Sequence, residues 1–367
     1  MGKSQPHEPQ PHLGPQVEPR TQREQFQTHE LATVLSHYDI GVIEQIREYR
    51  RGSRRAPKLR IKSKKGNFLL KRRAPGRDDP YRVAFAHSLQ IVLAENKYPV
   101  PGFVGTNETN NSLLQLNGRI YELFRYVKGD RYGKTIAQTH DAGRALGALH
   151  RLLSDFKPQY DPPFGAYHAM PGIDARLTQI PEMVISAEPN ADIKTLKKTC
   201  AFIQKTYNHA ANKVEKLGYR TWPSTVVHGD WHPGNLLFKD GTVVAVLDFD
   251  SARLECAMAD LANGALQFSM KMSWPDDPDT WPKGLDSERI RAILRGYHET
   301  AHRRLTDDEI AALPWLMIEA LIMESVVPIA ATGSFGRIAG SAFLNMVERE
   351  CRWLISRADK LVKFLED

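Results

Sequence analysis

The segment from His228 to Leu237, read with the strand-like run that follows it, constrains the fold more than any other part of the chain. Apolar residues flank a polar loop on both sides, and Asp240-Gly241 is a tight-turn signal between two strand-like runs. We expect this hairpin to bring Asp230, Asn235 and Asp248 close together. Two carboxylates and an amide on adjacent loops match what phosphoryl transfer requires: one carboxylate orients an acceptor hydroxyl, and the other groups bind Mg²⁺. The alternative is a hairpin whose Asp and Asn side chains only cap turns.

The pattern His-Gly-Asp-x-x-x-x-Asn, followed by Asp-x-Asp at Asp248 and Asp250, resembles the aminoglycoside phosphotransferase family. That family includes choline kinases, type II homoserine kinases and spore-coat kinase-like proteins. The resemblance covers roughly residues 38–360. It implies an α+β, bilobal protein kinase-like fold. Residues 29–126 would form a small antiparallel β lobe that binds the nucleotide, and residues 127–367 a mostly helical lobe that carries the catalytic and metal loops.

The resemblance also assigns roles to individual residues. It implies that Asp230 is the catalytic residue and that the cofactors are ATP and Mg²⁺. Asn235 and Asp248 would bind Mg²⁺, and Asp250 would take a second metal ion or a coordinated water. The γ-phosphoryl group would pass to a hydroxyl of a small metabolite.

Lys71 follows the apolar run Phe68-Leu69-Leu70 and matches the family lysine that contacts the α- and β-phosphates. Arg72 and Arg73 come next, so three basic residues compete for this assignment. Strand alternation places Leu69 and Lys71 on one face, and the apolar run before Lys71 favours that residue. The other interpretation of Lys71 is a surface lysine on an edge strand.

Two further nucleotide contacts are implied by position. The loop of residues 50–57 corresponds to the family loop over the phosphates, but Gly52 is its single glycine. Backbone N–H groups of Gly52 and Ser53, with nearby arginines, would hold phosphate oxygens, although a plain basic turn explains the same residues. Backbone groups near Glu122 to Phe124, at the hinge between the lobes, would read the adenine edge. An ordinary strand leading into a linker is the alternative there.

The helix expected over Pro80–Lys97 departs from the family pattern in one charge. The family usually has a glutamate here that pairs with the lysine of the neighbouring strand. The position falls near His87; neither His87 nor Gln90 is acidic, and Glu95 lies two turns further along. The orientation of Lys71 is therefore in question. On its own, His87 is typical of a satisfied, partly buried histidine.

Other polar residues near the motif have structural interpretations. We expect His228 to brace the loop and His232 to lie near the phosphate or the acceptor, because zinc would need a closed set of ligands and no cysteine is nearby in sequence. Trp231 is expected to pack rather than to line the acceptor pocket. Asp260, within Ala259-Asp260-Leu261-Ala262, resembles the aspartate of the family's Asp-Leu-Ala, which steadies the catalytic loop; a helix N-cap is the alternative.

The net charge of +7 is unevenly distributed. Lys and Arg crowd residues 47–73, where Glu48 is the only acid. Such density suggests an anionic partner: nucleotide phosphates, an acidic substrate or nucleic acid. A solvated face of the small β lobe accounts for most of these side chains. No aromatic-interleaved RNA motif accompanies them, so a nucleic-acid partner is not favoured.

Composition excludes several classes of protein. Hydrophobic residues make up 41% and charged residues 25%, as in ordinary globular proteins. Residues 1–28 are polar and Pro-rich, which predicts a disordered tail. The longest apolar run, Pro314–Ala331, is interrupted by Glu319 and Glu324 and predicts a buried helix rather than a membrane span. With three scattered cysteines and no signal-peptide pattern, we expect a cytoplasmic protein.

Periodicity and turn signals predict the remaining elements. Strands are expected over residues 43–49, 59–63, 67–72, 113–116 and 119–126. The chain is expected to turn helical from about residue 136, with helical spacing of apolar residues over 141–153, and further helices are expected over 195–217, 286–303 and 341–364. A capping box at Thr306 opens another helix, which Pro314 should end or kink. Residues 156–172 are expected to form a long loop.

The leading hypothesis is an ATP-dependent kinase whose acceptor is a small hydroxylated metabolite. Homoserine, choline, ethanolamine, thiamine and sugars all remain possible acceptors. A polycationic antibiotic is not favoured, because the C-terminal half has mixed charge. The main rival is a nucleotide-binding scaffold, or pseudokinase, with little activity; the missing helix acid and the poor glycine loop favour it, whereas Asp230, Asn235 and Asp248 oppose it.

Overall fold

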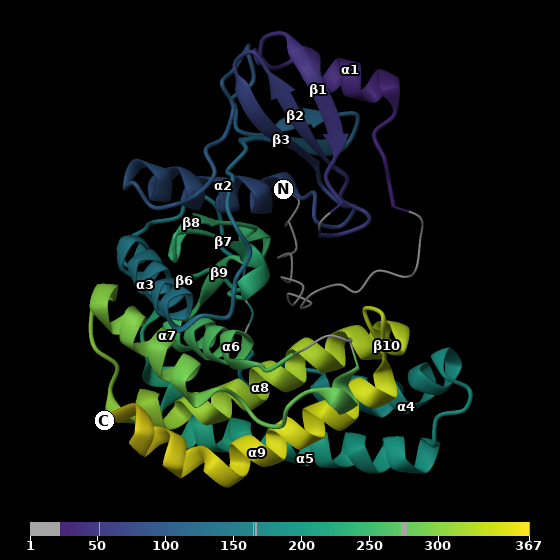
Figure 1. Ribbon diagram of the computed structural model, residues 1–367, viewed down its shortest axis with the longest axis vertical. Coiled ribbons are helices and arrows are strands. Elements are labelled where there is room, and N and C mark those ends of the chain that lie inside the picture. Colours follow the sequence, from purple (N-terminus) through teal and green to yellow (C-terminus); the bar gives the residue numbers. More distant parts are fainter. Residues whose placement is uncertain (1–22, 51, 164, 166, 273–276, 367) are drawn as a thin grey trace, which may run out of the picture.

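The computed structural model describes residues 23–50, 52–163, 165, 167–272 and 277–366. Strands β1 to β5 and helices α1 and α2 form an upper lobe, and the other labelled helices gather in a larger lobe below it (Figure 1). One cluster of buried apolar residues joins α1 to the five-stranded sheet, and a larger cluster fills the lower lobe and also includes residues of α2. The predicted α+β, bilobal kinase-like fold is therefore confirmed.

The N-terminal lobe is built on one antiparallel sheet with the strand order β1-β2-β3-β5-β4. Its elements are α1 (Thr28–Ser36), β1 (Ile43–Glu48), β2 (Lys58–Ser63), β3 (Gly66–Arg72), α2 (Pro80–Glu95), β4 (Leu114–Leu116) and β5 (Arg119–Arg125). These bounds lie within one or two residues of the expected strands and of the helix predicted over Pro80–Lys97.

The register of this sheet sets the charges of the site. Lys71 on β3 lies opposite Lys58 on β2 and opposite Glu122 on β5. Because side chains alternate across a strand, Leu69 shares a face with Lys71, and both line the space between the lobes. Lys71 is thus on a central strand, not on an edge.

The predicted tail of residues 1–28 is only partly described. Residues 1–22 lie outside the described part of the chain, but from Arg23 onward the chain contacts the N-terminal lobe. Glu24 and Glu30 both form ion pairs with the buried guanidinium of Arg72. The stretch from residue 23 to residue 28 is therefore packed against the lobe, which corrects the predicted tail boundary.

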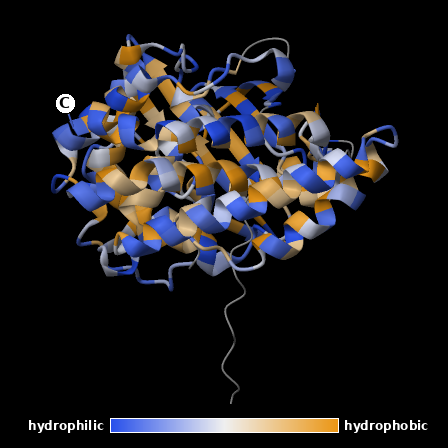
Figure 2. Ribbon diagram, turned by 90° about the horizontal axis from the view of Figure 1, so that it is seen from below, coloured by the Kyte–Doolittle hydropathy of each residue, from blue (hydrophilic) through white to orange (hydrophobic). Residues whose placement is uncertain are grey.

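The C-terminal lobe contains seven helices among its described residues, with short strands between them. The helices are α3 (Ile136–Leu153), α4 (Ile173–Ala187), α5 (Ile193–Lys216), α6 (Ala257–Ser269), α7 (Ser287–Thr300), α8 (Asp307–Thr332) and α9 (Gly340–Glu366). The strands are β6 (Ser224–Val227), β7 (Leu236–Lys239), β8 (Thr242–Val246), β9 (Arg253–Cys256), β10 (Ser334–Phe335) and β11 (Ile338–Ala339). Seen from below, the helices carry hydrophobic and hydrophilic residues side by side (Figure 2).

The predicted hairpin around Asp240-Gly241 is confirmed as β7 paired with β8. Asp240 has a φ of 51° and Gly241 a φ of 84°, so both central residues adopt the left-handed conformation that favours Asp-Gly in a two-residue turn. The strand-like run before the motif is β6, which pairs with β9 and not with the β7–β8 hairpin. The polar loop between β6 and β7 is thereby held from two separate small sheets.

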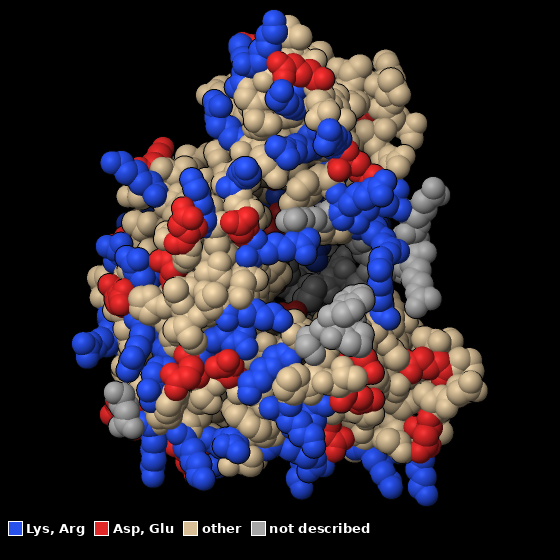
Figure 3. Space-filling view, in the orientation of Figure 1, with Lys and Arg blue, Asp and Glu red and all other residues tan. Residues whose placement is uncertain are grey.

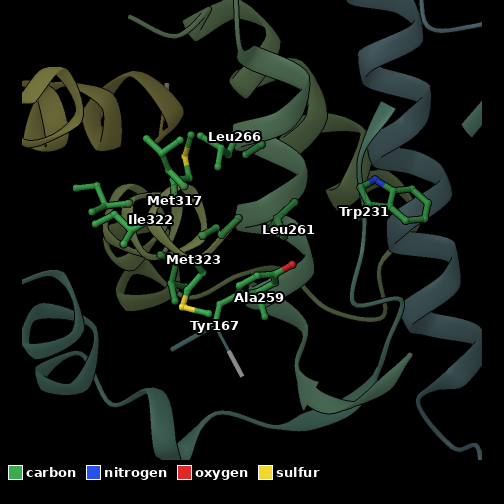
Figure 4. Packing of buried hydrophobic residues seen from close by; sticks show 14 of the residues in the cluster. Tyr167, Trp231, Ala259, Leu261, Leu266, Met317, Ile322 and Met323 are labelled. Atoms are coloured by element: carbon green, nitrogen blue, oxygen red, sulfur yellow. The ribbon is translucent and has the colours of Figure 1, made fainter. Parts of the chain in front are cut away.

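Helix α8 passes through the middle of the C-terminal lobe. It is long and apolar enough to cross a membrane, but 78% of its most apolar window is buried inside the protein. In Figure 4, α6 lies between Trp231 on one side and Met317, Ile322 and Met323 of α8 on the other. The predicted buried helix is confirmed. Pro314 does not end α8, which continues to Thr332, so of the two expected effects of this proline the kink stays a prediction; the buried apolar surface of the helix outweighs one lost backbone hydrogen bond.

Candidate active site

A cleft of about 1040 Å³, open to solvent, lies between the lobes. Lys and Arg side chains surround a hollow between the two lobes on the face shown in Figure 3. The sequence-predicted residues that line the cleft come from both lobes and are Gly52, Lys71, Glu122, Phe124, Asn235, Asp248 and Asp250. Tyr126 and Val127, at the hinge after β5, also line it. The structure therefore brings together side chains that are up to about two hundred residues apart in sequence.

Asp230 lies on the loop between β6 and β7. The Asn235 side-chain amide donates hydrogen bonds to the Asp230 carbonyl oxygen at 3.0 Å and to its Oδ2 at 2.9 Å. Burial raises the pKa of Asp230, but His232, through a hydrogen bond and its charge, outweighs burial and leaves the pKa below its ordinary value. The side chain is 34% exposed. Asp230 is thus an ionised, oriented carboxylate that a hydroxyl can reach.

Asp260 of α6 holds this loop from below. Its two carboxylate oxygens accept the backbone N–H groups of His228 at 2.6 Å and of Gly229 at 2.8 Å. His150 Nε2 of α3 lies 3.2 Å from Asp260 Oδ2. Helix α6 begins at Ala257 with Cys256 as its N-cap, so Asp260 is not the cap. The two interpretations of Asp260 are a residue that steadies the loop and a helix N-cap. Its contacts with His228 and Gly229 fit the first interpretation.

The histidines and the tryptophan of the motif have clear contacts. His228 is buried; its Nε2 donates to the Leu247 carbonyl at 3.0 Å and its Nδ1 accepts from Asp230 N at 3.3 Å, so it braces the loop as expected. His232 Nδ1 accepts the Gly234 N–H at 2.9 Å while its Nε2 lies 3.5 Å from Asp230. Trp231 is fully buried, as the packing interpretation predicts.

Asn235 and Asp248 are suited to a hard cation. The Asn235 nitrogen is used by Asp230, which turns the amide oxygen away from that residue. The Asp248 side chain is 39% exposed, and the Lys71 ammonium, at 3.8 Å, is its nearest cationic contact among the described residues. Asp248 also has a φ of 63°, a conformation that is uncommon outside glycine and recurs at functional sites. One carboxylate and one amide oxygen facing a cleft match the oxygen ligands of Mg²⁺.

Asp250 belongs to a different cluster. Its carboxylate lies 2.9 Å from the Lys71 ammonium and 2.9 Å from the Arg73 guanidinium, and only 12% of its side chain is exposed. Burial raises its pKa, but Arg73 and Lys71 outweigh burial and hold the pKa far below its usual range. A carboxylate already neutralised by two cations is a poor ligand for a second metal ion. Asp250 therefore anchors Lys71 and Arg73 through ion pairs, and its role at a second metal ion stays a prediction.

Glu122 completes the cluster. It is fully buried, and its two oxygens accept hydrogen bonds from Arg73 Nε at 2.9 Å and Nη2 at 2.8 Å. Lys71 Nζ lies 3.8 Å from the same carboxylate. Glu122 is therefore a charged neighbour of Lys71, and its backbone lies within the β3–β5 ladder.

This arrangement accounts for the missing helix acid. His87 of α2 occupies the expected position and contacts Glu122 Oε1 through Nε2 at 2.7 Å and Ser112 through Nδ1 at 2.8 Å. The carboxylate that most members of the family take from the helix comes here from strand β5, and His87 ties the helix to it. Glu122 is 35 residues from His87 in sequence, so no local pattern indicated the exchange.

The loop between β1 and β2 contributes less than expected. Gly52 lines the cleft with a φ of 77°. Ser53 is not among the lining residues; its hydroxyl accepts the Arg55 N–H at 3.1 Å and its carbonyl accepts a hydrogen bond from Arg23 at 3.0 Å. Ser53 therefore braces the loop. Lys58, at the start of β2, lines the cleft although sequence reasoning assigned it no role.

A second carboxylate faces the acceptor side of the motif. Glu324 of α8 accepts a hydrogen bond from the Tyr167 hydroxyl at 2.5 Å, and the same hydroxyl lies 3.4 Å from the Gly229 carbonyl, next to Asp230. Burial and the charge of Asp230 raise the pKa of Glu324 to about 7. In the sequence Glu324 only interrupts an apolar run, so its neighbours could not be inferred.

The fold and the cleft define a kinase-like phosphotransferase. The chain belongs to the phosphotransferase enzyme family, whose model matches residues 45–307, and it is an ATP-dependent small-molecule kinase. It is 25% identical over 295 residues to homoserine kinase of Phenylobacterium zucineum (strain HLK1), covering 78% of this chain and 80% of that protein. The fold is similar to that of a microcompartment-associated aminopropanol kinase, with a TM-score of 0.65, 15% identity, and coverage of 92% of this chain and 99% of that one. It is also similar to an amicoumacin kinase in complex with AMP-PNP and Ca²⁺, with a TM-score of 0.64, 13% identity, and coverage of 91% and 94%.

Proposed function

We propose that this protein transfers the γ-phosphoryl group of ATP to the hydroxyl of a small amino alcohol, that is, an acceptor carrying both a hydroxyl and a cationic nitrogen. The observation that carries the proposal is the pair of carboxylates, Asp230 and Glu324, connected through Tyr167 and the backbone of Gly229. Asp230 supports a hydroxyl acceptor. Glu324 supports the cationic nitrogen, because an anionic side chain in a partly buried site attracts a cation.

The nucleotide side of the site follows from the cleft. Lys71 would bind α- and β-phosphate oxygens, exchanging part of its contact with Asp250 for them. Asn235 and Asp248 would hold Mg²⁺, which, when bound, neutralises phosphate charge during transfer. Backbone groups at Tyr126 and Val127 would meet the adenine edge, since they line the cleft at the hinge. In such a site, positioning and charge neutralisation supply most of the catalysis.

Asp230 would accept the hydrogen bond of the acceptor hydroxyl and hold its oxygen in line with the γ-phosphate. Its low pKa keeps it ionised at neutral pH. His232 keeps Nε2 toward Asp230 because its Nδ1 is occupied as an acceptor of the Gly234 N–H. These contacts fix the direction of the carboxylate before the acceptor arrives.

A matched panel tests the proposal. ATP consumption is measured with Mg²⁺ present and absent, using homoserine, 1-amino-2-propanol and choline, and using 1,2-propanediol as the uncharged counterpart of aminopropanol. We expect Mg²⁺-dependent turnover with at least one amino alcohol and much weaker turnover with the diol. Equal turnover of the charged and uncharged acceptors would contradict the role of Glu324. Binding of AMP-PNP without turnover of any acceptor would favour the nucleotide-binding scaffold instead.

We also expect the protein to act in the cytoplasm, where ATP and small metabolites are available. Its three cysteines are buried free thiols, which suits a reducing compartment.

A further inference from the structure

Lys58 is a second lysine in the cleft, and its surroundings differ from those of Lys71. It is the first residue of β2 and pairs directly with Lys71 across the β2–β3 ladder. Both side chains line the cleft from the same face of the sheet. The side chains of Lys58 and Lys71 are therefore neighbours on the face of the sheet that covers the proposed phosphate site.

The two lysines differ in their partners. Lys71 lies within ion-pair distance of Glu122, Asp248 and Asp250. No carboxylate of the described chain forms an ion pair with Lys58, although its side chain is half-buried. Burial lowers its pKa, and attraction by Asp248 only partly offsets this. A half-buried cation without a paired anion, facing an open cleft, is suited to bind an anionic ligand.

The position of Lys58 points to the outer phosphates of a nucleotide. A Cβ atom added to Gly52 would come within 2.9 Å of Lys58 Nζ, so the ammonium lies directly beneath the loop that corresponds to the family's phosphate loop. Asp248, the proposed metal ligand, exerts the strongest attraction on its charge. The ammonium is therefore between the loop and the metal site, where the terminal phosphates of ATP would lie.

We propose that Lys58 binds the terminal phosphates of the nucleotide and supplies from strand β2 the contact that a glycine-rich loop supplies through its backbone. With a single glycine, this loop has few positions at which its backbone can approach phosphate oxygens closely, and a charged donor beneath the loop replaces those contacts. This inference rests on the proposed nucleotide site and adds a residue to it.

Lys62 provides a matched control. It lies on the same strand and the same face as Lys58, further from the cleft, and its ammonium forms an exposed ion pair with Glu44. Substituting either lysine with Met removes one positive charge from β2. Only the change at Lys58 removes a charge from the cleft.

The test measures the dissociation constant of AMP-PNP with Mg²⁺ for the wild type and for Lys58→Met, Lys58→Arg and Lys62→Met, after thermal unfolding has shown that each variant folds. We expect Lys58→Met to weaken binding roughly 10- to 100-fold, as for the loss of a charged hydrogen bond. Lys58→Arg should retain most of the affinity, and Lys62→Met should bind like the wild type.

Two results would overturn the inference. One is a Lys58→Met protein that binds AMP-PNP as tightly as the wild type does, and the other is an equal loss in Lys62→Met, which would indicate a general effect of net charge. If Lys58→Met fails to fold, Lys58→Arg is the deciding variant. It must bind AMP-PNP about as tightly as the wild type does, and a loss of affinity in this variant would count against the proposal. A wild-type protein that binds no AMP-PNP would instead reject the proposed nucleotide site itself.

Discussion

Asp230 and Glu324 lie near each other beside the motif, and their surroundings give their carboxyl groups different pKa values. Hydrogen bonding and the charge of His232 keep Asp230 ionised against the effect of burial. Glu324 lies near Asp230 and has a pKa raised to about 7 by burial and by that neighbouring charge. Neighbouring acidic groups with separated pKa values are a common arrangement in enzymes that move protons or bind charged substrates.

Asp230→Ala should abolish most of the turnover while leaving the fold intact. The substitution removes the group that orients the hydroxyl, and such losses typically lower the rate by a factor of about 10²–10⁴. The KM for ATP should change little, because Asp230 is not among the residues that line the nucleotide cleft. Steady-state kinetics on an identified acceptor, together with a melting curve, decide this. Turnover at the wild-type rate would reject the assignment of Asp230.

The charge of Glu324 should appear in the pH dependence. Below its pKa of about 7 the carboxyl is neutral, and above it the group is anionic, so kcat/KM for a cationic amino alcohol should rise as the pH increases through about 7. Glu324→Gln should flatten that rise and lower kcat/KM most at high pH. Asp230, His232, Tyr167 and Arg253 also influence Glu324 and are unchanged in this variant. A rise that persists in Glu324→Gln would assign the titration to another group.

At the scale of single residues, the sequence predicted those whose role follows from the motif. Asp230 and Asn235 contact each other, and Asp248 lines the same cleft. The sequence could not predict the contacts of Glu122 or Glu324, because their partners come from distant elements. Their local patterns are those of an ordinary strand and an apolar helix. Long-range pairing of buried charges leaves no periodic signal in the chain.

Among the elements, helices α3 and α7 make the closest backbone approach that the described glycines reveal. A Cβ atom on Gly296 of α7 would lie 1.9 Å from the His140 carbonyl oxygen, and one on Gly143 of α3 would lie 2.0 Å from the Ile293 carbonyl oxygen. Reciprocal glycines therefore let the two helices touch along their backbones. Since α3 also carries His150, this contact supports the anchor of the catalytic loop.

Gly296→Ala should destabilise the protein by about 1–3 kcal/mol or more, because the helices must separate to admit a methyl group. Gly102→Ala is the control: its added Cβ would meet only the Arg125 side chain, at 3.8 Å, which is an ordinary contact. Denaturant unfolding of both variants measures the difference. Equal stabilities would show that the helix pair accommodates the methyl group.

Elements with strong periodicity were predicted to within a few residues, and the failures have physical causes. Helix α4 (Ile173–Ala187) was missed because Pro171 and Pro181 are typical of a loop, yet Pro181 lies inside the helix and is buried. Pro314 likewise lies inside α8, which continues past it. In both helices tertiary packing outweighs the local preference of proline.

For the whole molecule, the link between the lobes includes a set of ion pairs. Asp250 belongs to the C-terminal lobe, whereas Lys71 lies on strand β3 of the N-terminal lobe and Arg73 directly follows that strand. Both cations also lie near Glu122, so the buried charges balance. The bilobal architecture followed from the motif and the order of the elements, but this connection across the cleft did not.

Asp250→Asn should destabilise the protein by about 3–5 kcal/mol, because it leaves Glu122 as the single carboxylate of the described residues that pairs with both buried cations, Lys71 and Arg73. Asp240→Asn removes one carboxylate from an exposed turn whose φ of 51° asparagine tolerates, and it should have little effect. Urea unfolding of the two variants checks the prediction. If both lose equal stability, the ion pairs of Asp250 contribute nothing specific.

Strand β5, which supplies Glu122 beside Lys71, alters how such an enzyme can be switched. In protein kinases, swinging the helix outward breaks the lysine–glutamate pair and turns the enzyme off. This means of control is absent here, because Glu122 lies in the same sheet as Lys71. Helix α2 contributes His87 to the contact with Glu122 and no carboxylate. A displaced α2 would leave Lys71, Arg73 and Glu122 assembled, so movement of that helix alone would not separate the lysine from its carboxylate.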